Sequence, residues 1–253
     1  MIIGNKIYQK EKCYNSLEWA KEKLNTAPDG SIFLADVHKY TKGRQSRIWK
    51  QYKGQLLITI LLKPTNLNII SDLPLRLNQL NMSISLGILE PLKKYNVVLK
   101  WPNDFMINTK KIGGIITQII WENNNVTGII FGFSINVNNI FEKSDELYPI
   151  ATSLKSHLNK TIDKKELLQD LLKSIDNFYK LWLNLKFDEI YKLYKNNQNY
   201  LKKEIRCHKS DKTLIEGIFY DLLENGNIVI KTKNENNKII SFNVIENLEI
   251  TQK

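Results

Sequence analysis

The sequence lacks long apolar runs and contains only two cysteines, and these absences narrow the class of protein. No apolar stretch approaches the roughly 18 residues that a membrane-spanning helix needs. The opening residues, MIIGNKIYQKEK, contain no apolar core of a signal peptide. Cys13 and Cys207 lie far apart and near no CxxC or Cys/His spacing, which argues against a zinc site or a disulfide framework. We therefore expect a cytoplasmic protein with reduced thiols and no membrane association.

The sequence also lacks a GxxxxGK[ST] loop, so it contains no P-loop for nucleotide phosphates. Its net charge is +11, from 37 Lys and Arg against 26 Asp and Glu. Such a charge indicates an acidic partner, which could be nucleic acid, a phosphorylated ligand or an acidic protein. Because lysine and asparagine are abundant throughout, as in KNNQNY and KTKNENNK, the charge is weak evidence for nucleic-acid binding.

The first 200 residues combine strand and helix patterns. Residues 15–25 place Leu17, Ala20 and Leu24 at helical spacing, with Asn15 positioned to cap the first turn. Further predicted helices run from about Pro74 to Leu92 and over residues 163–185. Predicted strands are KIYQKEK (6–12), SIFLADV (31–37), QLLITILLK (55–63), VVLKW (97–101), IGGIITQIIW (112–121) and VTGIIFGFSINV (126–137). These patterns predict an α/β (α+β) domain with a mixed β-sheet flanked by helices.

The pattern changes past residue 203. Five short strands separated by turn signals follow, EIRCH, TLIEGIFY, NIVIKT, KIISF and VIENLEI, and the turn ENGN lies between two of them. Five short strands in about fifty residues are typical of a small barrel or sandwich. We therefore divide the chain into a larger domain, residues 1–202, and a small β domain, residues 203–253.

The stretch KWPNDFMINTKKIGG carries the strongest functional signal. KWPND ends a predicted strand and KKIGG begins the next, so the hairpin should bring Asp104 and Lys111 toward the same edge of the sheet. Gly113 and Gly114 lack side chains, which in a strand indicates the close approach of a ligand or of another backbone. The alternative is a hairpin with a surface salt bridge and a glycine bulge.

A polar loop, TKGRQSRIW, precedes this hairpin in the sequence. Lys42, Arg44 and Arg47 alternate with small residues and are followed by Trp49, a composition suited to folding over a phosphate and a planar group. A solvated basic loop is the alternative reading.

Loop and hairpin together resemble the biotin protein ligase family. KWPND with the following K-x-G-G is similar to that family's most specific signature, and GRQSRIW to the second half of its GRGRxGRxW loop. FGFSINVN is similar to its GxGINVN strand, and ATSLKSHLNKTIDKKELL to its ATSL-initiated helix region. The resemblance covers nearly all of the chain. It implies the catalytic fold shared by biotin and lipoate ligases and class II synthetases, followed by an SH3-like barrel.

The resemblance also implies a stand-alone form that does not bind DNA. The first predicted strand starts within ten residues of Met1, which leaves no room for the N-terminal helix-turn-helix module of some members.

The resemblance implies a two-step reaction. Biotin would be activated by ATP to biotinyl-5′-AMP with Mg²⁺ present, and then transferred to a lysine of a biotin carboxyl carrier protein or domain. Lys111, Asp104 and Arg47 would be the catalytic residues: Lys111 and Arg47 as cations at the developing charge, and Asp104 as the group that orients or deprotonates the acceptor amine. Other predicted contacts to the substrates are Gly43, Arg44, Trp49, Lys100, Asn103, Gly113, Gly114 and Asn136. No protein metal ligands are predicted.

The sequence departs from the family where biotin's ureido ring should bind. The family's Ser-Thr-Asn triplet is replaced by residues around Asn15 and Ser16, and its glutamine position reads His38. These three side chains and Lys42 could supply the hydrogen bonds. Two other functions stay open: a lipoate or octanoate ligase of the same fold, and a non-enzymatic basic nucleic-acid-binding protein. A homodimer is compatible with the family.

Overall fold

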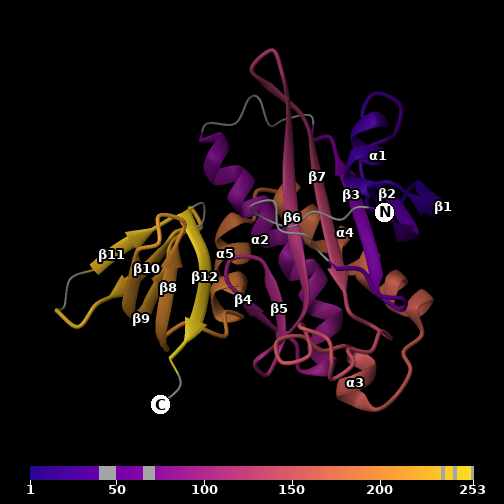
Figure 1. The fold of residues 1–253 in the computed structure, drawn as a ribbon. Helices are drawn as coiled ribbons and strands as arrows, with labels where there is room; N and C mark the ends of the chain where they lie inside the picture. Colours follow the sequence, from indigo (N-terminus) through magenta and orange to yellow (C-terminus); the bar gives the residue numbers. More distant parts are fainter. Residues whose placement is uncertain (40–49, 65–71, 235–236, 242–243, 252–253) are drawn as a thin grey trace.

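The structure is a computed structural model that describes residues 1–39, 50–64, 72–234, 237–241 and 244–251. It contains a seven-stranded mixed sheet with helices on both faces and a separate five-stranded antiparallel sheet formed by the C-terminal residues (Figure 1). The fold class predicted from the sequence is confirmed. No helix in the described ranges is long and apolar enough to cross a membrane.

The large sheet has the strand order β1-β2-β3-β7-β6-β5-β4. Its strands are β1 (Ile7–Cys13), β2 (Ser31–His38), β3 (Leu56–Leu62), β4 (Val98–Lys100), β5 (Asp104–Ile107), β6 (Lys110–Glu122) and β7 (Asn125–Ile135). β1 pairs with β2 in parallel and all other neighbours are antiparallel. β3 and β7 are almost continuously apolar because both of their faces are covered.

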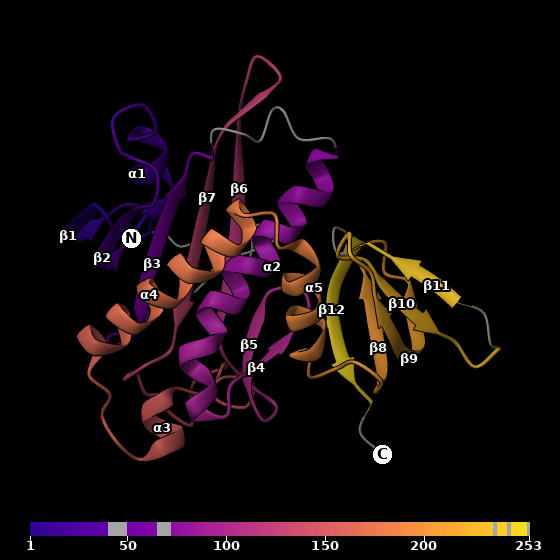
Figure 2. The same ribbon diagram turned by 180° about the vertical axis from the view of Figure 1, so that it is seen from behind.

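The two faces of the sheet bury different helices. α2 (Leu73–Leu92) and α4 (Lys164–Leu183) pack on one face, where the main core forms (Figure 2). α1 (Ser16–Glu22) packs on the other face, where Leu17 and Ala20 meet Phe33 and Leu61. The predicted cap of α1 is confirmed, because the Asn15 carboxamide oxygen accepts the N–H of Leu17 at 2.8 Å; at α4, Asp163 accepts the N–H groups of Lys165 and Glu166. A short helix, α3 (Leu154–Leu158), and a 3₁₀ turn, Lys93–Tyr95, complete this part.

Two elements of this part were not predicted. The sequence predicted one turn between KWPND and KKIGG, but residues DFMI form β5 between them, so β4, β5, β6 and β7 make a four-stranded meander. Phe105, Met106 and Ile107 are all buried, so this short run lacks the alternation of apolar and polar residues that would make it stand out as a strand. The second is α5 (Phe187–Asn196), which follows α4 after a turn at Leu185 with φ of 59°.

The C-terminal sheet contains all five predicted strands: β8 (Glu204–Lys209), β9 (Leu214–Leu222), β10 (Ile228–Lys231), β11 (Asn237–Ile240) and β12 (Ile245–Ile250). Their order is β11-β10-β9-β8-β12. This sheet lies beside α5 (Figure 1). The Tyr191 hydroxyl of α5 donates to the Leu222 carbonyl at 2.6 Å. The boundary between residues 202 and 203 stays a prediction, although β8 begins next to it.

Candidate active site

Asp104 and Lys111 meet on one face of the β5–β6 hairpin. The Lys111 Nζ lies 2.5 Å from the Asp104 Oδ1, and both side chains are partly exposed, 31% for Lys111 and 18% for Asp104. Asp104 pairs with Gly114, and Met106 pairs with Lys111, so Ile112 is an extra residue on β6. In a regular strand Lys111 and Gly114, three positions apart, would face opposite sides. The β-bulge removes this mismatch and turns Lys111 toward Asp104.

The two glycines of KKIGG have different neighbours. A Cβ on Gly113 would lie 2.4 Å from the Ser134 carbonyl oxygen, so this glycine allows β6 to approach the β7 backbone. A Cβ on Gly114 would lie 3.3 Å from both Cε and Nζ of Lys111. Gly113 therefore serves strand packing, whereas Gly114 leaves room for the Lys111 side chain. The sequence predicted the approach of a ligand or of another backbone at these glycines; the backbone approach is confirmed at Gly113, and the place for the Lys111 side chain at Gly114 was not predicted.

The segment before α3 flanks Lys111. The N–H of Lys111 donates to the Ile150 carbonyl at 2.8 Å, and the N–H of Thr152 donates to the Lys111 carbonyl at 2.9 Å. These bonds fix the backbone of Lys111 on the side away from β5. The ATSL stretch, which the sequence analysis singled out for its resemblance, therefore lies next to Lys111.

Asn136 directly follows β7 and lies close to β6, the strand that carries Lys111. Its N–H donates to the Ile112 carbonyl at 2.7 Å, and its side-chain oxygen accepts the amide of Gln55 at 2.8 Å. Both amide side chains are buried. Gln55 was missed by the sequence analysis, because a glutamine before an apolar strand carries no signal of its own. The role of Asn136 as a substrate contact stays a prediction.

Asn15, Ser16 and His38 gather at the end of the parallel strands β1 and β2. Cys13 is paired with His38 across these strands, and α1 begins three residues after Cys13. Asn15 caps α1, and the Ser16 hydroxyl lies 2.7 Å from the Thr59 hydroxyl. Both predicted ligand contacts thus already stabilise the fold.

His38 differs from Asn15 and Ser16 because its side chain has no hydrogen-bond partner among the described residues. Its backbone N–H donates to the Gln51 side chain at 2.9 Å, but neither ring nitrogen has a hydrogen-bond partner among the described residues. Burial lowers the pKa of His38, so its imidazole is neutral near pH 7. A buried neutral imidazole can donate one hydrogen bond and accept another, which suits a polar ligand.

Lys100 and Asn103 lie beside Asp104. Lys100 pairs with Asp104 across β4 and β5, and its Nζ lies 5.5 Å from the centre of the Tyr200 ring. The Asn103 amide donates to the Ile115 carbonyl at 2.9 Å, and the Asn103 carbonyl accepts the N–H of Ile115. Burial, followed by the charges of Asp104 and Glu249, raises the pKa of Tyr200. Asp104 and Glu249, which comes from the C-terminal sheet, thus both act on Tyr200.

Five predicted site residues lie outside the described residues: Lys42, Gly43, Arg44, Arg47 and Trp49. The segment that follows them is anchored by Tyr52, whose hydroxyl donates to Asp145 Oδ2 at 2.6 Å. In the described ranges, no group of three or more His, Cys, Asp or Glu side chains could hold a metal ion.

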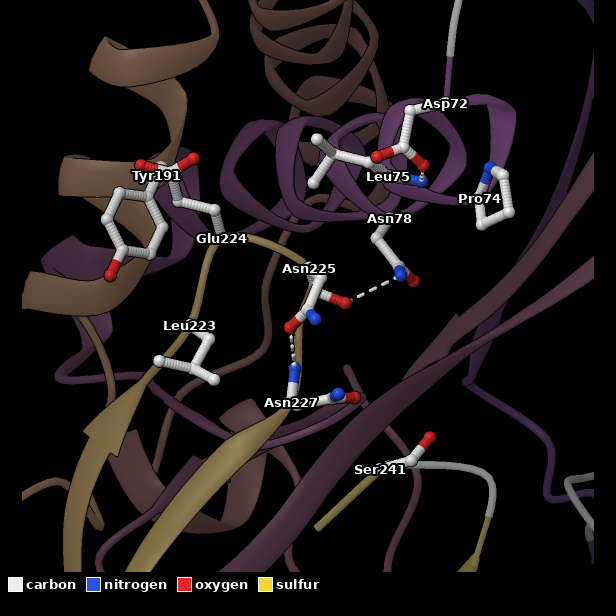
Figure 3. Close-up of a pocket in the computed structure, with 10 residues that line it drawn as sticks. All are labelled: Asp72, Pro74, Leu75, Asn78, Tyr191, Leu223, Glu224, Asn225, Asn227 and Ser241. Carbon is white, nitrogen blue, oxygen red and sulfur yellow. Dashed lines mark hydrogen bonds between the residues drawn. The ribbon is translucent and has the colours of Figure 1, made fainter. Parts of the chain in front are cut away.

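A separate hollow of about 750 Å³ lies between the start of α2, α5 and the β9–β10 turn (Figure 3). Its lining consists of Asp72, Pro74, Leu75, Asn78, Tyr191, Leu223, Glu224, Asn225, Asn227 and Ser241. None of the predicted site residues lines it. It is a crevice where the two parts of the protein meet, crossed by a 2.7 Å hydrogen bond from the Asn78 amide to the Asn225 carbonyl.

Known proteins share this sequence pattern and this fold. The biotin/lipoate A/B protein ligase family model matches residues 9–136, slightly more than half of the chain. The bifunctional ligase/repressor BirA of Bacillus subtilis is 28% identical over 256 residues, covering 96% of this chain and 74% of the relative. Biotin–protein ligase 2 of Arabidopsis thaliana is 26% identical over 176 residues, covering 66% of this chain and 50% of the relative.

A solved structure is also similar over almost the whole chain. The biotin protein ligase from Aquifex aeolicus, in complex with biotin and ATP, superposes with a TM-score of 0.81 at 26% identity. The similarity covers 98% of this chain and 100% of that one. It therefore includes the C-terminal sheet as well as the large sheet.

Proposed function

The chain belongs to the biotin/lipoate A/B protein ligase family, and from that premise we propose that it is a biotin protein ligase acting through the Asp104–Lys111 pair. It activates biotin with ATP and transfers it to a lysine of a biotin carboxyl carrier protein or domain. The observation that carries this proposal is the joining of Asp104 and Lys111 across the bulge, in a fold similar to an enzyme solved with biotin and ATP.

Lys111 acts in the first step. A carboxylate oxygen of biotin attacks the α-phosphorus of ATP, the bond to the β-phosphate bridge breaks, and pyrophosphate leaves with the bonding electron pair. Two anionic groups must come together, so a cation at the reacting centre lowers the barrier by stabilising the added charge. Lys111 provides this cation, and Gly114 leaves the space in which its side chain can turn from Asp104 toward the phosphate. Arg44 and Arg47 are proposed to assist.

Asp104 acts in the second step. The acceptor amine must lose a proton before it can attack the carbonyl carbon of biotinyl-5′-AMP and release AMP. Asp104 accepts or orients that proton. Its partner in the resting protein is the ammonium of Lys111, and a second ammonium, that of the acceptor lysine, can take the same place. The pairing supports this role, because the carboxylate already accepts one ammonium group.

The remaining predicted contacts divide between the two ends of the substrate. The ureido end of biotin is proposed to bind Asn15, Ser16, His38 and Lys42. Both ring nitrogens of His38 are available to form hydrogen bonds with it, because neither has a partner among the described residues. The adenylate is proposed to contact Gly43, Trp49, Lys100, Asn103 and Asn136. The hydrogen bond from Gln55 holds the Asn136 side chain in place.

Magnesium is proposed to enter as part of the substrate MgATP. The described residues do not fit a metal site built by the protein, because they contain no cluster of three or more suitable side chains. Mg²⁺ commonly keeps several waters and binds through substrate phosphates, so no protein cage is needed. Action in the cytoplasm, a carrier domain as acceptor and the formation of a homodimer stay proposals of the same kind.

The test is isotope exchange between pyrophosphate and ATP. Exchange that depends on biotin supports the proposal, because it reports reversible formation of the adenylate. Exchange that depends on lipoate would instead indicate the lipoate ligase branch of the family. If the folded protein catalyses no exchange with either biotin or lipoate, it is not an adenylating enzyme of this kind.

A further inference from the structure

We propose that the hydroxyl group of Tyr194 is a positioning group for the active-site turn, residues 101–103 between β4 and β5. By binding the carbonyl oxygen of Pro102 it fixes the orientation of the peptide that leads into Asp104. This inference rests on the proposed function, because it concerns the step in which Asp104 takes part.

The active-site turn is held at several points around Tyr194. At its base, Lys100 and Asp104 are paired across β4 and β5. The Trp101 ring N–H donates to the Gly226 carbonyl at 3.0 Å, which ties the turn to the ENGN turn of the C-terminal sheet. On the far side, Asn103 exchanges two hydrogen bonds with the backbone of Ile115. Between these anchors lies the carbonyl of Pro102.

Tyr194 reaches that carbonyl from α5. Its hydroxyl donates to the Pro102 oxygen at 3.0 Å, and its side chain is 3% exposed. Burial raises the pKa of Tyr194 far above its ordinary value, so the hydroxyl keeps its proton at any pH used for assay. The hydroxyl is therefore a permanent donor in a dry place, where losing the bond would leave a carbonyl oxygen without that partner.

The support behind Tyr194 is itself fixed to β4. The Leu99 carbonyl accepts the N–H of Asn199 at 2.8 Å, and the Leu99 N–H donates to the Asn197 carbonyl at 3.4 Å. The residues that end α5 thus run beside β4 as an added strand-like pairing, a parallel bridge between Leu99 and Gln198. Tyr194 is held at a constant distance from the turn on which it acts.

The geometry of the peptide bond explains why this one contact matters. In a planar trans peptide the C=O and N–H groups point in opposite directions. The Pro102 carbonyl points toward α5, so the N–H of Asn103 points away from it. Rotation of this peptide would redirect Asn103 and the start of β5. It would thereby also change the direction in which the Asp104 carboxylate approaches an amine. A misplacement of about 1 Å in such a group can reduce the rate by about 100-fold.

Two other tyrosines provide matched controls. Tyr191, on the same helix, donates its hydroxyl to the Leu222 carbonyl at 2.6 Å, a bond of the same chemical type that holds the C-terminal sheet instead. Tyr179 in α4 donates to Asp29 at 3.4 Å and lies on the other side of the core. The Tyr191 hydroxyl also accepts from the Lys195 Nζ at 3.3 Å, so its removal costs at least as many hydrogen bonds as removal of the Tyr194 hydroxyl, but none of these bonds involves the active-site turn.

The experiment is a double-mutant cycle on single-turnover transfer from preformed biotinyl-5′-AMP to a biotin carboxyl carrier domain. The variants are Tyr194→Phe, Tyr191→Phe and Asp104→Asn, together with the double variant of Tyr194 and Asp104. We expect Tyr194→Phe to slow transfer about tenfold while the KM for biotin, measured separately by pyrophosphate exchange, is unchanged, and Tyr191→Phe to change the transfer rate less than about twofold. In the Asp104→Asn background, Tyr194→Phe should add no further loss, because the group that it positions is gone.

Equal effects of Tyr194→Phe and Tyr191→Phe, or losses at Tyr194 and Asp104 that multiply, would overturn the proposal. If Tyr194→Phe does not fold, Tyr194→Met, which fills the space with a flexible apolar chain, takes its place. Failure of both to fold would make the hydroxyl a determinant of folding and also overturn the proposal. A wild-type protein without biotin-dependent exchange would instead contradict the proposed function itself.

Discussion

Lys111 and Asp104 are joined across a β-bulge, with Nζ and Oδ1 2.5 Å apart, and each compensates the charge of the other in the resting protein. Two roles are thereby held in one place: a cation for the phosphate step and a carboxylate for the amine step. The pair is only partly exposed, 31% for Lys111 and 18% for Asp104, so removing one partner leaves a partly buried charge, and thermal unfolding of each variant is measured beside its activity.

Lys111→Ala should lower the rate of biotin-dependent pyrophosphate exchange by about 100-fold or more, because a cation aimed at developing charge is removed. The matched control is Lys110→Ala. Lys110 is the neighbouring lysine, and its Nζ donates to the Tyr148 carbonyl at 2.8 Å on the exposed surface. The control should retain exchange within about twofold, as expected for a surface substitution. Exchange by Lys111→Ala at the rate of the control would remove Lys111 from the mechanism.

Asp104→Asn should slow transfer from biotinyl-5′-AMP by about 100-fold, and adenylate formation much less, because only transfer requires loss of an amine proton. The two steps are measured separately, by single-turnover transfer and by pyrophosphate exchange. The amide keeps the shape of the carboxylate, so the comparison isolates its charge and basicity. Equal slowing of both steps would make Asp104 a structural residue.

Gly113→Ala should lower mainly the stability of the protein, whereas Gly114→Ala should lower mainly its rate of pyrophosphate exchange. The added methyl group at Gly113 meets the Ser134 carbonyl at 2.4 Å, so we expect a loss of about 1–3 kcal/mol in the free energy of unfolding. At Gly114 it meets the Lys111 side chain at 3.3 Å, and that side chain can shift. Gly114→Ala should therefore unfold at nearly the wild-type temperature but exchange pyrophosphate more slowly. Thermal unfolding and exchange assays on both variants check this; the opposite order would contradict the assignment.

His38→Gln should change how stability depends on pH. Burial lowers the pKa of His38 in the folded state, so below about pH 6.5 the unfolded chain binds a proton that the folded protein does not. The wild type therefore loses stability as the pH falls through this range, and the variant, which has no titrating group there, should lose less. Denaturant unfolding between pH 7.5 and 5.5 measures the difference. Parallel stability curves would show that His38 titrates normally.

The sequence predicted more of the fold than of the site's detail. Long apolar periodicities located β3, α2 and α4, and the turn signals located all five strands of the C-terminal sheet. The approach of Asp104 to Lys111 was also predicted, but by a simpler hairpin than the real one. β5 is four residues long, and the bulge at Ile112 depends on how two strands pair, which the residue pattern of one strand does not specify.

Contacts between segments that are distant in the chain could not be predicted from the sequence. Tyr194 meets Pro102 only because α5 packs beside β4, and no periodicity in residues 187–196 refers to a turn ninety residues earlier. Gln55 finds Asn136 for the same reason, through the pairing of β3 with β7. Such side chains become visible once the strand order is known, because their partners are set by tertiary packing.

The most direct test of the central claim is the mass of a biotin carboxyl carrier domain after incubation with this protein, biotin and MgATP. The account predicts that the domain gains one biotin, on one lysine, only when all three components are present, and that Lys111→Ala prevents the gain. A carrier domain left unmodified by folded wild-type protein, or modified equally well by Lys111→Ala, would contradict it.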